Sequence, residues 1–126
     1  MLRLIRFVFI VGFLEGTAAH AYDLADGGVH AFRGFPLVSQ ILFHALLILD
    51  PLAAWLVWKR IPSAPLLGAA IMIADDAANW QGNWPSVHAD PSILLRPYGL
   101  PVLTLFGVFV VLTALPLRRS FAAQPA

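Results

Sequence analysis

Cysteine is absent from this chain of 126 residues, and charged residues are scarce. Without thiols the chain can form no disulfide, thiolate zinc site, iron–sulfur cluster, c-type haem attachment or cysteine nucleophile. Charged residues make up 12% of the sequence and the formal net charge is only +1, whereas ordinary soluble domains are about 25% charged. There is no run of Lys or Arg and no patch of interleaved basic and aromatic residues. The sequence therefore predicts no nucleic-acid partner.

The motifs of common catalytic and cofactor sites are also missing. Neither HExxH nor an ExxH pair occurs, so imidazole and carboxylate ligands for zinc, iron or manganese are not indicated and we predict no metal site. The glycines after Asp26 resemble a turn rather than a phosphate-binding loop, and the serines lack a GxSxG setting. His20 and His44 could supply axial ligands to haem b from different helices, but no motif supports this. The sequence leaves the cofactor unknown.

Apolar residues dominate what is present. They form 60% of the chain, against about 45–50% in soluble domains, and the mean hydropathy is +0.78. Four apolar segments are close to the roughly 17–25 residues that a membrane-spanning helix needs. They cover residues 4–21, 37–58, 64–80 and 100–117. We therefore expect an all-α fold, a four-helix transmembrane bundle that forms one integral membrane domain over residues 1–126.

The cations predict the orientation of this bundle. Six of the eight Lys and Arg residues fall on one side of a chain that crosses four times, namely Arg3, Arg6, Lys59, Arg60, Arg118 and Arg119. Because cytoplasmic loops of membrane proteins are enriched in Lys and Arg, both termini should be cytoplasmic and both longer linkers outside. The expected location is the cell membrane, as a multi-pass protein.

The first segment allows a second interpretation. Arg3 and Arg6, the following apolar run and the sequence Ala19-His20-Ala21 also fit a secretory signal, in which case the mature chain would begin at Tyr22. Glu15 beside the apolar run is unusual for such a signal and favours a retained helix. Cleavage would remove both Glu15 and His20 from the site considered next.

The third segment carries ionisable groups where a lipid-facing helix should have none. At about 100° per residue, Asp75, Asp76 and Asn79 lie within about 100° of one another, on the face that also carries Gly68 and Met72. An ionisable group at membrane depth is costly unless it faces a partner or a water-filled cavity. We therefore expect these three side chains to point into the bundle.

The second segment has a matching polar face. Gln40, His44 and Asp50 fall within one arc of about 140°, and His44 lies one turn beyond Gln40. Pro51 follows Asp50, so its ring should displace the carbonyl of Leu47 from its helical hydrogen bond. That free carbonyl would lie beside the Asp50 carboxyl group.

The first segment contributes an acid between small residues. Gly12 and Gly16 form a GxxxG pair, typical of close helix contact, and Glu15 lies on the same face. At about 1.5 Å per residue, Glu15, His44 and the two aspartates all reach the outer half of the bilayer, with Asp50 deeper. The fourth segment carries only Thr104, Thr113 and glycines between apolar residues. The sequence thus predicts one outward-facing polar cluster: Glu15, His20, Gln40, His44, Asp50, Asp75, Asp76 and Asn79.

Each of these residues also has a purely structural interpretation. Asp75 and Asp76 could mark a hydrated helix end, or form a desolvated pair that shares one proton. Glu15 could be a neutral buried acid, His44 a packed histidine, and Asp50 a group that only holds helices together.

Three functions remain open at this stage. The leading hypothesis is a small membrane protein whose outward-facing pocket binds a small hydrophobic, lipid-like or cationic ligand, or relays protons or cations. The alternatives are a non-catalytic subunit of a membrane complex, and a membrane-embedded acid/base enzyme for a lipid-soluble substrate. The expected partners are the lipid bilayer and a second copy of the chain or a membrane complex. In architecture alone, the outline is similar to the emopamil-binding and sigma-2-receptor-like sterol-binding group, with no motif in common.

Overall fold

The computed structural model describes residues 1–123 and is all-α over that range, which confirms the all-helical part of the predicted fold. Four long helices are joined in part by two short 3₁₀ helices: α1 (Leu2–Gly27), η1 (Gly28–His30), α2 (Leu37–Trp58), α3 (Ala64–Ala89), η2 (Pro91–Leu95) and α4 (Leu100–Ala122). Two of them, α2 and α4, are long and apolar enough to cross a membrane.

The predicted helix bounds agree best where proline marks an end. Helix α2 covers the expected residues 37–58, beginning directly after Pro36. The other three helices continue beyond their apolar segments, since the structure has 2–27 instead of 4–21, 64–89 instead of 64–80, and 100–122 instead of 100–117. Hydropathy falls where polar residues begin, but helical backbone hydrogen bonding continues through them. Pro85 and Pro116 consequently lie inside α3 and α4.

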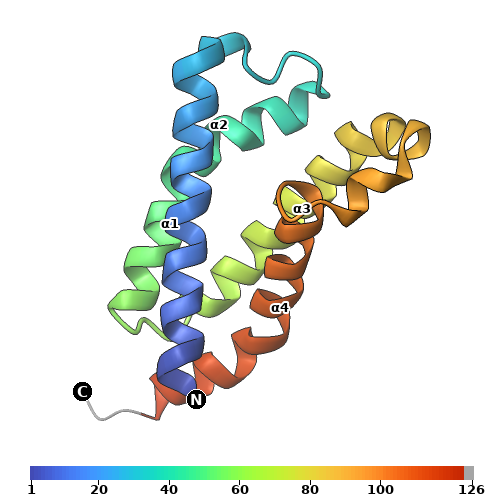
Figure 1. Ribbon diagram of the computed structural model, residues 1–126. Coiled ribbons are helices and arrows are strands. Elements are labelled where there is room, and N and C mark those ends of the chain that lie inside the picture. The colour runs from blue at the N-terminus through green and yellow to red at the C-terminus, as the bar shows by residue number, and fades with distance from the viewer. Residues whose placement is uncertain (124–126) are drawn as a thin grey trace.

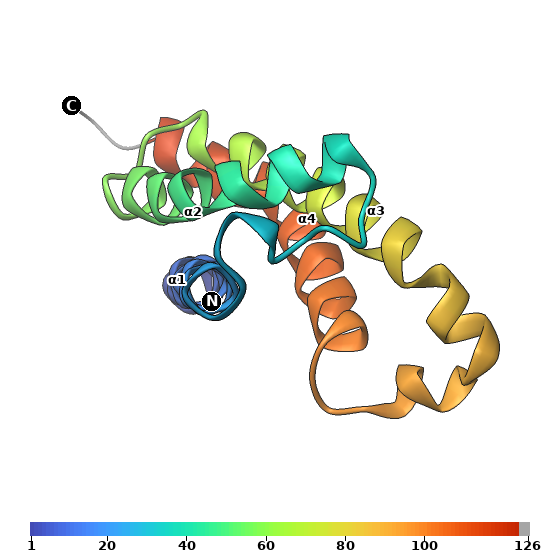
Figure 2. The ribbon, with the colours of Figure 1, turned by 90° about the horizontal axis from the view of Figure 1, so that it is seen from above.

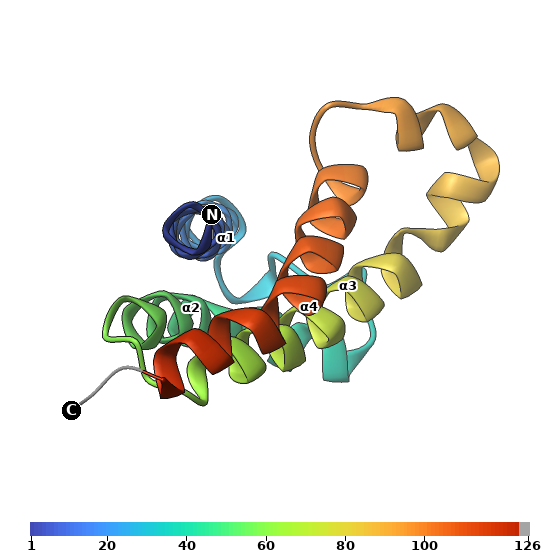
Figure 3. The same cartoon turned by 90° about the horizontal axis from the view of Figure 1, so that it is seen from below.

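The helices form two hairpins. Helix α1 packs along α2, and α3 packs along α4; the hairpins meet chiefly where α2 contacts α3, with a smaller contact between α1 and α4 (Figure 1). Seen from above and from below, α1 is separated from α3, and the first part of α4 lies between them (Figures 2 and 3). The start of α1, the α2–α3 turn and the last turns of α4 share one end, which we call the closed end (Figure 1). The linkers 28–36 and 90–99 occupy the other end, called the open end.

A packed hydrophobic core fills the half of the molecule next to the closed end. Phe9 and Val57 are 0% exposed, Phe13 and Leu117 1%. Gly68 of α3 lies directly under the rings of Phe9 and Phe13. A side chain at position 68 would collide with these rings. The glycine therefore allows the phenylalanine rings of α1 to pack directly against the backbone of α3. Each such buried ring contributes several kcal/mol to stability, about 3–5 kcal/mol when truncated to alanine.

Basic side chains gather at the closed end. The Arg6 guanidinium donates a hydrogen bond of 2.6 Å to the carbonyl of Trp58, the last residue of α2. The ammonium group of Lys59 lies 4.9 Å from the centroid of the Trp58 ring. Carbonyls at a helix C-terminus lack intrahelical partners and attract cations. The Arg6 hydrogen bond ties the start of α1 to the end of α2.

Candidate functional site

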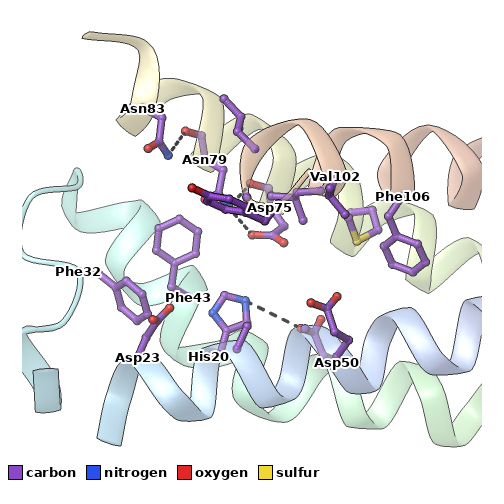
Figure 4. A pocket seen from close by; sticks show the side chains of 18 of the residues that line it. His20, Asp23, Phe32, Phe43, Asp50, Asp75, Asn79, Asn83, Val102 and Phe106 are labelled. Atoms are coloured by element: carbon purple, nitrogen blue, oxygen red, sulfur yellow. Dashed lines mark hydrogen bonds and ion pairs between the residues drawn. The ribbon is translucent and has the colours of Figure 1, made fainter. Parts of the chain in front are cut away.

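A large cavity opens in the half of the molecule next to the open end (Figure 4). Its volume is about 850 Å³, within the range of about 300–1,000 Å³ that is typical of ligand pockets. All four long helices and both linkers contribute to its lining. The apolar wall includes six aromatic rings, those of Phe13, Phe32, Phe35, Phe43, Phe106 and Tyr98.

Two glycines of α1 bring that helix close to its neighbours at the deep end of the cavity. Gly12 lies against the ring of Phe106 on α4, and a Cβ at Gly16 would lie 2.8 Å from the Oδ2 atom of Asp50 on α2. The GxxxG spacing places both contacts on one face of α1. Close helix approach at this face, predicted from the sequence, is therefore what the structure shows.

Asp50 lies at the bottom of the cavity with few partners. Its exposed fraction is 4%, and within residues 1–123 its carboxylate accepts no side-chain or backbone hydrogen bond. Nε2 of His20 lies 3.9 Å from Oδ2 of Asp50, at the distance of an ion pair (Figure 4). The His20 ring stacks on Phe43 at 6.0 Å between centroids and meets Phe32 edge-on at 6.2 Å. Its Nδ1 atom is buried and has no hydrogen-bond partner in the described part of the chain.

Asp75 faces the same cavity from α3, within a ladder of amides. Its exposed fraction is 5%. The side-chain amide of Asn79 donates to Oδ1 of Asp75 at 2.8 Å and to its backbone carbonyl at 3.0 Å. One turn further, the Asn83 amide donates to the carbonyl of Asn79 at 2.8 Å (Figure 4). The spacing of four residues stacks the three side chains on one face, so α3 presents a polar stripe to the cavity.

Asp76 takes a different direction from Asp75, although the sequence analysis placed both in one cluster. Its carboxylate contacts Gly107 on α4, and it does not line the cavity. One turn later, the indole N–H of Trp80 donates to Oγ of Thr104 at 2.9 Å. Adjacent residues of a helix point about 100° apart, and here that angle separates a cavity-facing acid from one in the α3–α4 contact.

Gln40 and His44 also lie apart from the cavity, with His44 edge-on to the Phe32 ring. The Gln40 amide donates to the carbonyl of Phe35 at 2.8 Å, and Nδ1 of His44 lies 2.7 Å from the Gln40 carbonyl. Because a carbonyl only accepts, the Nδ1 atom of His44 carries the proton of this bond. These two residues fix the linker 28–36 onto α2. The structure thus brings together Glu15, His20, Asp50, Asp75 and Asn79 of the predicted cluster, and leaves Gln40, His44 and Asp76 outside it.

Charged residues at the cavity mouth were not among the predicted site residues. Asp23 and Asp26, on the last turns of α1, line it together with Arg96 from the linker. Arg96 is in an ion pair of 3.8 Å with Asp90. Hydrogen bonds from the hydroxyl and the backbone N–H of Ser92, aided by Arg96, lower the pKa of Asp90. The only sequence signal for these residues was their position in linkers that flank the outer helix ends.

The described residues were searched for a metal site, and the chain was compared with known proteins. Within residues 1–123 no group of three His, Asp or Glu side chains is placed to hold a metal ion. Comparison with protein-family models, with curated proteins and with solved structures gives no match for this chain.

Proposed function

We propose that this chain is a four-span protein of the cell membrane that binds a small amphiphilic ligand in an outward-opening cavity. The observation that carries the proposal is the cavity itself: about 850 Å³, lined by aromatic rings and by carboxylates from three different helices. An interior that served only helix assembly would be filled by side chains, as the closed half is. A hollow with apolar walls and few polar groups is the usual form of a ligand site.

The outer surfaces of the helices support a membrane location for all four. Each long helix exposes a pair of large apolar side chains seven residues apart, which is two helical turns: Phe7 and Leu14, Ile41 and Ile48, Leu66 and Ile73, and Leu105 and Leu112. Monomeric soluble proteins rarely expose contiguous apolar surfaces of this kind. Helices α1 and α3 carry acids: Asp75 is buried, and Glu15 is exposed but lines the cavity. The basic closed end would then lie in the cytoplasm.

The packing of the closed half favours binding over a proton or cation relay. Below Asp50 the space between the helices is filled by Phe9, Phe13 and Leu117, all nearly unexposed. A relay needs polar groups or water on both sides of the membrane. The cavity therefore resembles a site with access from one side only.

The proposal is tested by filling the cavity without touching its acids. Val102 lines the cavity from α4, whereas Leu105, one turn away on the same helix, is exposed outside it. Binding of a dodecyl-chain amphiphile to the purified protein in nanodiscs, followed as a shift in unfolding temperature, should disappear in Val102→Trp. It should persist in Leu105→Trp. Equal binding by both variants, or no binding by the natural protein, would overturn the proposal.

A further inference from the structure

The cavity lining contains more acidic than basic residues. Its lining contains five carboxylate residues: Glu15, Asp23, Asp26, Asp50 and Asp75. The basic groups in the lining are the guanidinium of Arg96 and the imidazole of His20. Arg96 lies at the mouth and is paired with Asp90, which does not line the cavity. No Lys or Arg among the described lining residues reaches the deep part of the cavity.

Asp50 gives the strongest indication of the chemical character of the ligand. It is buried, opens onto the cavity and accepts no hydrogen bond from residues 1–123. Nε2 of His20 is 3.9 Å from Oδ2 of Asp50, beyond hydrogen-bond distance. A buried carboxylate without a partner is costly, by several kcal/mol in general. A group that donates hydrogen bonds or carries positive charge at this point would remove that cost.

Asp75 approaches the same space from the opposite hairpin (Figure 4). The Asn79 amide occupies its Oδ1 atom, and Oδ2 accepts no hydrogen bond from the described residues. Asp50 and Asp75 thus line the same cavity from two different helices, α2 and α3. A cation between them would interact favourably with both carboxylates.

From these observations we propose that the ligand is an organic cation, an amphiphile with an ammonium group that lies between Asp50 and Asp75; this rests on the proposed binding function. The surrounding rings suit such a group, because a cation is attracted to the face of an aromatic ring within about 6 Å of its centroid. Phe43 and Phe106 line the cavity near these acids (Figure 4), and Phe13 is also part of the lining. A fatty acid or an acidic lipid headgroup would be repelled. A small inorganic cation would leave most of the apolar wall uncovered.

Three chain-matched probes test the charge requirement: dodecyltrimethylammonium, whose charge is independent of pH, neutral dodecanol and anionic dodecanoate. Each is titrated against the protein in nanodiscs of neutral lipid, with empty nanodiscs subtracted. We expect the ammonium probe to bind at least tenfold more tightly than dodecanol, and dodecanoate not to bind. If dodecanol binds as tightly as the ammonium probe, the charge inference fails but the proposed function stands. If no probe binds, both fail.

Two variants then locate the cation. The double variant Asp50→Asn, Asp75→Asn keeps the shape of both side chains. It should weaken binding of the ammonium probe at least tenfold while leaving binding of dodecanol unchanged. Asp76→Asn is the matched control, since Asp76 neighbours Asp75 on the same helix but faces α4. Equal weakening in Asp76→Asn, or none in the double variant, would overturn the inference. Circular dichroism and the retained dodecanol binding show whether each variant is folded.

Discussion

The closed half and the open half of this molecule are built from the same four helices, yet one is filled and the other is hollow. The difference follows from the connections and from the side chains between the helices. At the closed end, residues 59–63 join α2 to α3 in a tight turn, and Phe9 and Phe13 fill the space up to Gly68. At the open end the linkers are longer, and the Phe35 ring is inserted against Gly82 of α3. Each open-end linker joins the two helices of one hairpin, so the only chain connection between the hairpins is at the closed end, and the cavity forms at the other end.

The largest expected effect comes from breaking the filled half. Phe9→Ala should destabilise the protein by about 3–5 kcal/mol, because it opens a new cavity in a packed core. Phe106→Ala is the matched change in the hollow half, where the ring already borders the cavity. It should cost less, since it enlarges an existing space. Equilibrium unfolding in mixed micelles measures both. Equal losses would show that the two halves do not differ in packing as described.

A smaller effect is expected at the boundary between the halves. Gly16→Ala would place a methyl group against Oδ2 of Asp50, and overpacking of this kind typically costs about 1–3 kcal/mol. Gly34→Ala is the control, because nothing lies within 4 Å of a Cβ built there. That change should stay within about 0.5 kcal/mol. The comparison of unfolding free energies would contradict the close α1–α2 contact if Gly16→Ala were also neutral.

The smallest effect concerns the rim of the hollow half. Because Ser92 donates two hydrogen bonds to Asp90, the pKa of Asp90 should lie below that of a free aspartate. Ionised Asp90 therefore stabilises the folded state at pH values above the pKa that Asp90 has in the unfolded chain. This stabilisation is lost as the pH falls through the lowered pKa of Asp90 in the folded state. NMR titration of Asp90 measures the shift. Ser92→Ala should bring the pKa back toward its ordinary value, and an unchanged pKa in this variant would exclude Ser92 as the cause.

The sequence predicted the helices better than the directions of their side chains. Apolar length and proline placement were enough for α2, whose bounds were as expected. An arc of about 100°, however, is as wide as the angle between adjacent residues, so periodicity could not separate Asp75 from Asp76. The contributions of Asp23, Asp26 and Arg96 depend on how linkers and helix ends turn, which hydrophobic periodicity does not encode. Gln40 and His44 were placed by hydrogen bonds to a linker whose course the sequence did not predict.

The position of Asp50 at the bottom of the cavity also has an electrical consequence. In a bilayer crossed as proposed, the cavity connects with the outside, and only the packed layer around Phe9 and Phe13 insulates. Moving one elementary charge across the full membrane against 100 mV takes about 2.3 kcal/mol. The voltage drop, however, would fall mainly across the packed layer. An ion that entered from outside and stopped at Asp50 would cross little of the field, so its binding would depend only weakly on membrane potential.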